Sequence, residues 1–212
     1  MKHINERLIK ITNSLPKNIQ LVAVSKTQPL KFITEAYMQG QKDFGENRAL
    51  ELKEKASQLP KDIKWHMIGH LQTKKVKHII PYVSLIHSVD SIKLLNEINK
   101  RSKQFNKTTN CLLQIHIAEE QTKYGFNINE INTIIDYSKN LNSIKVVGLM
   151  GMATFTNNKE KVQQEFSMIN KEFIKIKNKT INTLSIGMSN DYKIAIKNGS
   201  TMIRVGSAIF GK

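Results

Sequence analysis

Cysteine and proline are scarce in this chain, with one cysteine, Cys111, and four prolines among 212 residues. A single cysteine cannot form an internal disulfide, so a reducing cytoplasm is the expected location. The first residues lack the apolar stretch of a secretory signal. The most apolar run, around residues 146–153, is far too short to span a bilayer. These absences predict a globular cytoplasmic protein that is not inserted in a membrane.

Acidic residues are also few, since 17 Asp and Glu oppose 33 Lys and Arg and leave a formal net charge of +16. A basic surface attracts phosphates without sequence preference, which raises nucleic acid as a partner. Arginine, the usual two-bond reader of bases and phosphates, occurs only at four positions, and the lysines are spread over the whole chain. No aromatic stacking motif accompanies them. We therefore expect a solvated lysine-rich surface and no specific nucleic-acid binding.

The sequence has no linker rich in proline, glycine or serine, and 40% of its residues are hydrophobic. This composition is too apolar for a disordered chain and sufficient for a sizeable core. No second domain is expected after the last predicted strand. The chain is therefore interpreted as a single domain over residues 1–212.

Eight short apolar runs alternate with amphipathic helical patterns along the chain. The strands are predicted at residues 19–25, 43–45, 64–69, 84–89, 111–118, 144–152, 183–188 and 201–210. The helices are predicted at residues 29–40, 46–59, 73–80, 91–104, 127–140, 158–177 and 190–198, with an extra N-terminal helix at 4–14. This alternation calls for parallel strands joined by helical crossovers, and eight such units can close into a (β/α)8 barrel of the TIM type. An open, doubly wound α/β sheet is the competing architecture.

Lys26 is placed at the end of the first predicted strand, where the active site of such a barrel would lie. It follows a run of valine, alanine and leucine, so partial desolvation would lower its pKa. A neutral amine can attack an aldehyde, whereas a protonated amine cannot, and this suits formation of a Schiff base. The alternative is that Lys26 is one more surface lysine in a lysine-rich chain.

A second candidate site for an anion comprises Ser189, Gly206 and Ser207. Ser189 is expected just before a helix, where free backbone N–H groups favour a phosphate. Gly206 would allow close approach of the backbone, and Ser207 adds a hydroxyl donor. Barrels often bind phosphate near the ends of strands seven and eight. The alternative is a plain helix cap at Ser189 and a glycine kept for packing.

Arg204 lies within an otherwise apolar strand, where an unpaired buried charge would be costly. Its partner would be a ligand nitrogen or carboxylate, or else an internal acid such as Glu46 or Asp191. Two histidines, His66 and His70, have i, i+4 spacing, but they fall on a strand and turn and not on a helix. No metal site is therefore expected.

Six motifs, in order along the chain, resemble the pyridoxal phosphate homeostasis protein family, which is related to the N-terminal barrel of alanine racemase. The resemblance extends from about Leu21 to the C-terminus. The motifs are residues 22–27 (VAVSKT), 44–47 (FGEN), 65–72 (WHMIGHLQ), 148–150 (GLM), 184–189 (LSIGMS) and 203–211 (IRVGSAIFG).

The resemblance implies a (β/α)8 barrel that binds pyridoxal 5′-phosphate (PLP), covalently attached to Lys26 as a Schiff base. The other matched cofactor-binding positions are Ser189, Gly206 and Ser207 for the phosphate, Arg204 for the pyridine nitrogen, and Asn47 and His66 for the lining of the pocket. One departure is Arg48, which stands where the family usually has an aromatic residue. That departure concerns the rim of the pocket and not cofactor binding.

The resemblance also implies a function, which is to hold PLP reversibly and to take part in its buffering or delivery. An arginine at the pyridine nitrogen weakens the ring as an electron sink, and a racemase needs a second acid or base on the opposite face. No catalytic residue is therefore expected. PLP-dependent apo-enzymes are expected as possible partners, and the chain is expected to be a monomer. A PLP-dependent racemase or lyase and an electrostatic binder of acidic surfaces are the alternatives.

Overall fold

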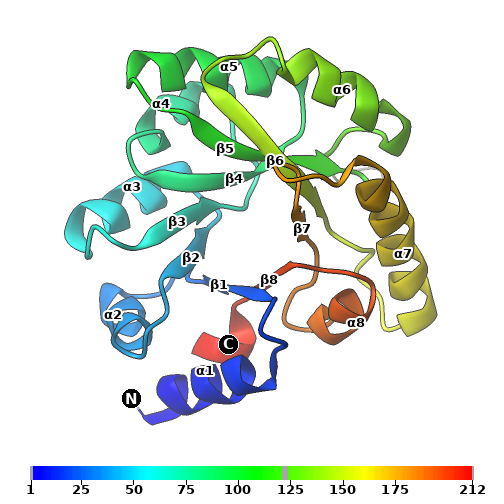
Figure 1. Cartoon of the computed structure of the whole chain (residues 1–212). Helices are drawn as coiled ribbons and strands as arrows, with labels where there is room; N and C mark the ends of the chain where they lie inside the picture. Colours follow the sequence, from blue (N-terminus) through cyan, green and yellow to red (C-terminus); the bar gives the residue numbers. More distant parts are fainter. Residues whose placement is uncertain (1, 121–123, 212) are drawn as a thin grey trace.

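Eight parallel strands close into a barrel, with each strand beside the next in sequence and β8 paired back onto β1 (Figure 1). The computed structural model describes residues 2–120 and 124–211. The strands are β1 (Gln20–Val24), β2 (Asp43–Glu46), β3 (Lys64–Met67), β4 (Val83–Val89), β5 (Thr109–Ile115), β6 (Ile144–Gly151), β7 (Thr183–Ser185) and β8 (Met202–Val205). The predicted (β/α)8 barrel is confirmed, and the open sheet was the wrong alternative.

Helices surround the barrel and cover the outer faces of the strands (Figure 1). They are α1 (Lys2–Ser14), α2 (Leu30–Met38), α3 (Ala49–Gln58), α4 (Val76–Ile79), α5 (Ile92–Gln104), α6 (Ile131–Ser138), α7 (Lys159–Ile176), α8 (Tyr192–Lys197) and α9 (Ser207–Phe210), with 3₁₀ turns η1 (Thr73–Lys75) and η2 (Ile128–Glu130). Polar caps set some of their starts. Ser91 Oγ accepts from Leu94 N–H at α5, and Asn158 Oδ1 accepts from Lys161 N–H at α7. Among the described residues, no helix is both long and apolar enough to cross a membrane.

Apolar side chains form two separate cores because successive residues of a strand point to opposite faces of the sheet. The larger core lies between strands and helices and includes Phe44, Trp65 and Phe166. The smaller core consists of Val22, Leu85, Leu112, Met150 and Met202. Each of its members comes from a strand, so this cluster fills the inside of the barrel.

The predicted strand at residues 201–210 is wrong in its second half. β8 ends at Val205, and α9 follows after Gly206. The N–H groups of Ile209 and Phe210 bond to Gly206 O, which closes a helical turn. Both side chains are buried in the larger core, and α9 packs beside α1. Apolar residues lie on both sides of Gly206 and Ser207 and suggested one strand, but the helical turn after Gly206 buries Ile209 and Phe210 in the core.

Gly148 lies inside β6, where neighbouring backbone leaves no room for a side chain. A Cβ at this position would come within 1.7 Å of Thr183 O on β7. Contact this close needs glycine whatever the backbone angles. Gly148 therefore allows the close packing of β6 against β7.

Candidate functional site at the barrel mouth

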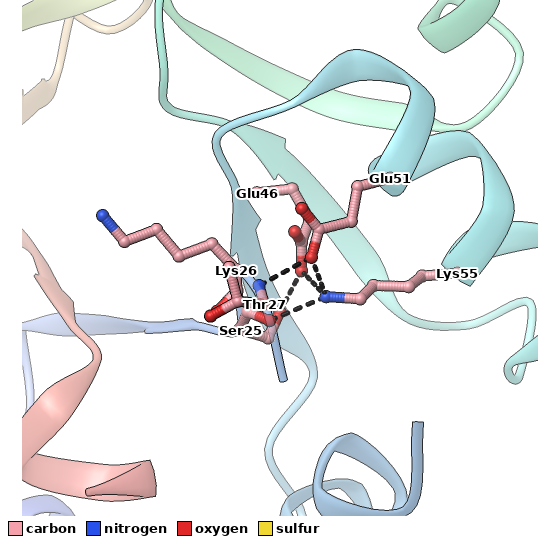
Figure 2. Close-up of polar contacts among 6 residues, drawn as sticks. All are labelled: Ser25, Lys26, Thr27, Glu46, Glu51 and Lys55. Carbon is pink, nitrogen blue, oxygen red and sulfur yellow. Dashed lines mark hydrogen bonds and ion pairs between the residues drawn. The ribbon is translucent and has the colours of Figure 1, made fainter. Parts of the chain in front are cut away.

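Lys26 follows the carboxyl end of β1, and its side chain extends away from the polar cluster around it (Figure 2). The side chain is exposed, which corrects the expectation of partial desolvation at the end of the strand. The apolar residues before it, Leu21 to Ala23, are buried, but the chain leaves the barrel before Lys26 is reached. The Lys26 amine is therefore accessible from the mouth of the barrel.

The residues on either side of Lys26 are held in place by two glutamates. Ser25 Oγ donates to Glu46 Oε1 over 2.5 Å, and Thr27 N–H donates to Glu51 Oε1 over 2.6 Å (Figure 2). Thr27 has a φ of 63°, a left-handed conformation that is strained for a β-branched residue. These bonds fix the backbone from which Lys26 projects.

Lys55, one turn after Glu51 on α3, joins the two glutamates to the loop. Its Nζ donates to Glu46 Oε1 at 2.9 Å, to Glu51 Oε1 at 2.7 Å and to Ser25 O at 2.7 Å (Figure 2). An ammonium has three protons, so these contacts use all of them. Lys55 is buried, and its three bonds leave it unsuited to the role of Lys26. We call Ser25, Thr27, Glu46, Glu51 and Lys55 the β1 clamp.

The β1 clamp contains one cation and two carboxyl groups, and the pKa values of the two glutamates shift in opposite directions. Burial raises the pKa of Glu46 from 4.5 to about 7, against the opposing effects of Ser25 and Lys55. Burial also raises the pKa of Glu51, but hydrogen bonds from Lys55 and Thr27 outweigh it, so this pKa is lowered. Glu46 is 0% exposed, and its Oε2 has no hydrogen-bond partner among the described residues. Glu46 is therefore the member of the pair that takes up a proton.

Ser189, Gly206 and Ser207 come together beside β1. Gly206 N–H donates to Ser189 Oγ over 3.2 Å, and a Cβ on Gly206 would lie 3.2 Å from Val24 Cβ. Ser207 begins α9, whose first N–H groups have no partner within the helix. The ends of β1, β7 and β8 thus place the three predicted anion-site residues on the side of the mouth next to Lys26.

Asn47 lies on the other side of Lys26, because β1 and β2 pair with Val24 opposite Gly45. A Cβ on Gly69 would lie 2.5 Å from Asn47 O, so the backbone of the β3 loop packs directly against Asn47. Asn47 also lines a cavity of about 580 Å³ together with Arg48 and residues of the β3 loop. Lys26, Ser189 and Arg204 do not contribute to this cavity, which therefore lies beside the mouth.

Arg204 is buried inside the barrel, with 3% of its surface exposed. Its Nη1 donates to Ser185 O at 2.7 Å and to Ser185 Oγ at 2.6 Å, and its Nη2 donates to Gly151 O at 3.0 Å. Burial lowers the pKa of Arg204 to about 10, and the charge of Asp191 opposes this effect. Glu46 pairs with Lys55 and not with Arg204. The guanidinium therefore stays charged at neutral pH on neutral oxygen acceptors.

His66 is 2% exposed and points into the barrel. One ring nitrogen lies 2.9 Å from Asp43 Oδ1, and the other lies 2.9 Å from His87 Nε2. Both nitrogens thus have partners within the chain. Within residues 2–120 and 124–211, no group of three or more histidine, cysteine, aspartate or glutamate side chains could hold a metal ion.

Several polar residues of the site were not predicted from the sequence. They are Glu51, Lys55, His87 and Ser185. The i, i+4 spacing of Glu51 and Lys55 was a usable signal. His87 and Ser185 each interrupt an apolar strand, which marks them as inward-facing polar groups, but no local pattern tells which residues they contact.

Comparisons with known proteins agree with one another. The family model described as alanine racemase, N-terminal domain, matches residues 1–212. A pyridoxal phosphate homeostasis protein of Aquifex aeolicus is 36% identical over 197 residues, covering 91% of this chain and 86% of the relative. The human protein of that name is 34% identical over 233 residues, covering 100% of this chain and 85% of the relative.

Solved structures give the same result. PipY of Synechococcus elongatus PCC7942, with PLP bound, has a TM-score of 0.89 and 31% identity, and the match covers 98% of this chain and 100% of PipY. An alanine racemase of Clostridium difficile 630 has a TM-score of 0.79 at 15% identity, a likeness in fold alone. The match covers 100% of this chain and 56% of that racemase.

The substitution Glu46→Gln is expected to flatten the pH dependence of the unfolding free energy between about pH 4.5 and 7. The pKa of Glu46 rises from 4.5 to about 7 on folding, so the folded chain keeps a proton that the unfolded chain loses. Stability therefore falls as pH rises through this window, by on the order of 3 kcal/mol from this group. Glutamine does not titrate and removes that slope.

Urea unfolding at a series of pH values measures this slope. Glu54→Gln, which changes an exposed acid on α3, is the matched control and is expected to keep the wild-type slope. A Glu46→Gln profile that parallels the wild type over this range would contradict the assignment of the proton to Glu46.

Proposed function

The chain belongs to the alanine racemase N-terminal domain family and, within it, to the pyridoxal phosphate homeostasis proteins, and on this premise we propose its role in the cell. It binds PLP and takes part in PLP homeostasis by holding the coenzyme and releasing it again. The observation that carries the proposal is the meeting of an accessible amine at Lys26 with polar donors at Ser189, Gly206 and Ser207, on neighbouring strand ends.

The residues of the barrel mouth fit the chemical groups of PLP. The coenzyme supplies an aldehyde that an amine captures reversibly as a Schiff base. The exposed Lys26 amine is free to take this part, because the β1 clamp binds its neighbours and not its side chain. The hydroxyls of Ser189 and Ser207 and the backbone at the start of α9 suit a phosphate. Asn47 and His66 are proposed to line the pocket.

Arg204 is proposed to face the ring nitrogen of the coenzyme. Its guanidinium remains protonated at neutral pH, and an arginine donates hydrogen bonds but does not accept them. A ring nitrogen opposite Arg204 would therefore accept a hydrogen bond and remain unprotonated. This arrangement withholds the proton that would make the ring an effective electron sink, which supports holding over turnover.

The substitution Lys26→Ala is expected to abolish covalent attachment of PLP while leaving the fold intact, because the side chain is exposed and makes no part of the core. Borohydride reduction followed by peptide mass mapping should find the pyridoxyl adduct on Lys26 of the wild type. Lys31→Ala, which removes another exposed lysine, is the matched control and should keep the adduct. No adduct on wild-type Lys26 in excess PLP would refute the attachment site.

Amino-acid turnover is expected to stay near that of free PLP. We propose that the barrel has no strong racemase or lyase activity, since Arg204 keeps its proton. Steady-state assays over a panel of L-amino acids, with free PLP at the same concentration as control, measure this. Turnover far above the free coenzyme would favour the enzyme alternative.

We also propose that PLP-dependent apo-enzymes receive the coenzyme, and that the chain acts as a monomer in the cytoplasm. A mixture of the loaded protein with such an apo-enzyme should restore enzyme activity. Placing a dialysis membrane between the two proteins distinguishes direct transfer from release of PLP into solution. The oligomeric state is measured separately, by light scattering, which should give a mass near 24.3 kDa for a monomer. A stable dimer or an apo-enzyme that stays inactive in the open mixture would count against these proposals.

A further inference from the structure

A continuous row of polar side chains crosses the inside of the barrel from Asp43 to Arg204. Asp43 Oδ1 lies 2.9 Å from His66 Nε2, and His66 Nδ1 lies 2.9 Å from His87 Nε2. His87 Nδ1 then lies 3.0 Å from Ser185 Oγ, which lies 2.6 Å from Arg204 Nη1. We call Asp43, His66, His87 and Ser185 the interior relay.

The interior relay begins and ends at opposite places in the barrel. Asp43 is the first residue of β2, at the amino end, whereas Ser185 is the last residue of β7. The bond between His87 and Ser185 joins β4 to β7, which are not neighbours in the sheet. It therefore spans the barrel interior and links the two walls. His66, His87 and Ser185 are all buried, so water does not compete for these bonds.

The two ends of the relay fix the direction of every hydrogen bond within it. Arginine only donates, and a carboxylate only accepts. Asp43 Oδ1 also accepts from Gln20 Nε2 at 2.8 Å, so a second donor lies at this oxygen. With both histidines neutral, Ser185 Oγ accepts from Arg204 and donates to His87 Nδ1. His87 Nε2–H then donates to His66 Nδ1, and His66 Nε2–H donates to Asp43.

The opposite direction needs one more proton. His87 Nδ1–H would then donate to Ser185, and His66 would have to carry protons on both nitrogens. Burial lowers the pKa of His87 well below its usual value, so the extra proton would have to reside on His66. His66 is itself buried, and a second cation in the same buried row as Arg204 would be costly. The neutral arrangement gives every ring nitrogen a matching partner without adding that cation.

We propose that the interior relay positions Arg204, fixing its guanidinium and the Nε2–H tautomer of both histidines through bonds that start at Asp43. The residues of the relay act through Arg204 and are positioning residues. The proposal rests on the proposed function where it concerns PLP, because Arg204 is the residue that would meet the coenzyme. It gives His66 a second role, which is to connect Asp43 to the hydrogen bonds that hold Arg204.

The tautomers can be read in the protein without coenzyme. Long-range ¹H–¹⁵N spectra of uniformly ¹⁵N-labelled apo-protein at neutral pH separate protonated from unprotonated ring nitrogens. Both His66 and His87 are expected as neutral Nε2–H tautomers, with the signals identified from His66→Gln and His87→Gln variants. An Nδ1–H tautomer or an imidazolium at either residue would overturn the relay, whatever the protein does with PLP.

The effect on the coenzyme is tested with Ser185→Ala, which removes the hydroxyl between His87 and Arg204. Without this bond the guanidinium must be ordered when PLP binds, so PLP affinity is expected to fall roughly tenfold, which corresponds to about 1.4 kcal/mol. Ser102→Ala is the matched control, because it removes another buried serine hydroxyl, which lies 2.7 Å from Thr109 Oγ1 on β5. The control is expected to lose stability but not affinity.

Absorbance titration with PLP gives the affinities, and urea unfolding gives the stabilities. Equal affinities for Ser185→Ala and Ser102→Ala would overturn the positioning of Arg204. If wild-type protein fails to bind PLP at all, the proposed function fails, but the histidine tautomers still decide the relay. If Ser185→Ala does not fold, the spectra of the wild type remain the deciding measurement.

Discussion

The pairing of β8 with β1 is the interaction on which the site depends. It closes the barrel through the register of Val22 opposite Arg204 and Ala23 opposite Val205. That pairing brings Lys26, near one end of the sequence, beside Gly206 and Ser207, near the other. Each part alone is ordinary, since one is an exposed lysine and the other a short helical turn. Backbone hydrogen bonds between two short strands bring them together in one candidate site.

The interior of this barrel contains both the smaller apolar core and the interior relay that leads to Arg204. Buried charges are costly unless they are paired and hydrogen bonded, and their contribution to stability is often small. Arg204 and Lys55 of the β1 clamp both donate hydrogen bonds within the barrel, but to different acceptors. Lys55 binds two carboxyl groups and one carbonyl, whereas Arg204 binds neutral oxygens. The carboxyl groups of the clamp thus oppose its cation directly, whereas the hydrogen-bond partners of Arg204 carry no charge.

The overall fold could be predicted because local patterns determine it. Apolar runs such as residues 20–24 and their helical partners repeat eight times, and parallel strands of this number close. The end of β8 could not be predicted, because Ile209 and Phe210 suit a strand as well as a buried turn. The exposure of Lys26 depends on where the chain leaves the barrel. The partners of His66 come from the neighbouring strands β2 and β4, and that of His87 from β7, 98 residues away, and no local periodicity encodes these contacts.

Thr27 carries a consequence of its own. A side chain with branching at Cβ resists a φ of 63°, so the loop would relax if Glu51 released its amide. Glycine would adopt the same angle without this resistance, but it would also allow many more directions for the lysine before it. Threonine therefore costs some stability and restricts the backbone more than glycine would. The backbone at Lys26 is held in one conformation by the protein alone, before any ligand binds.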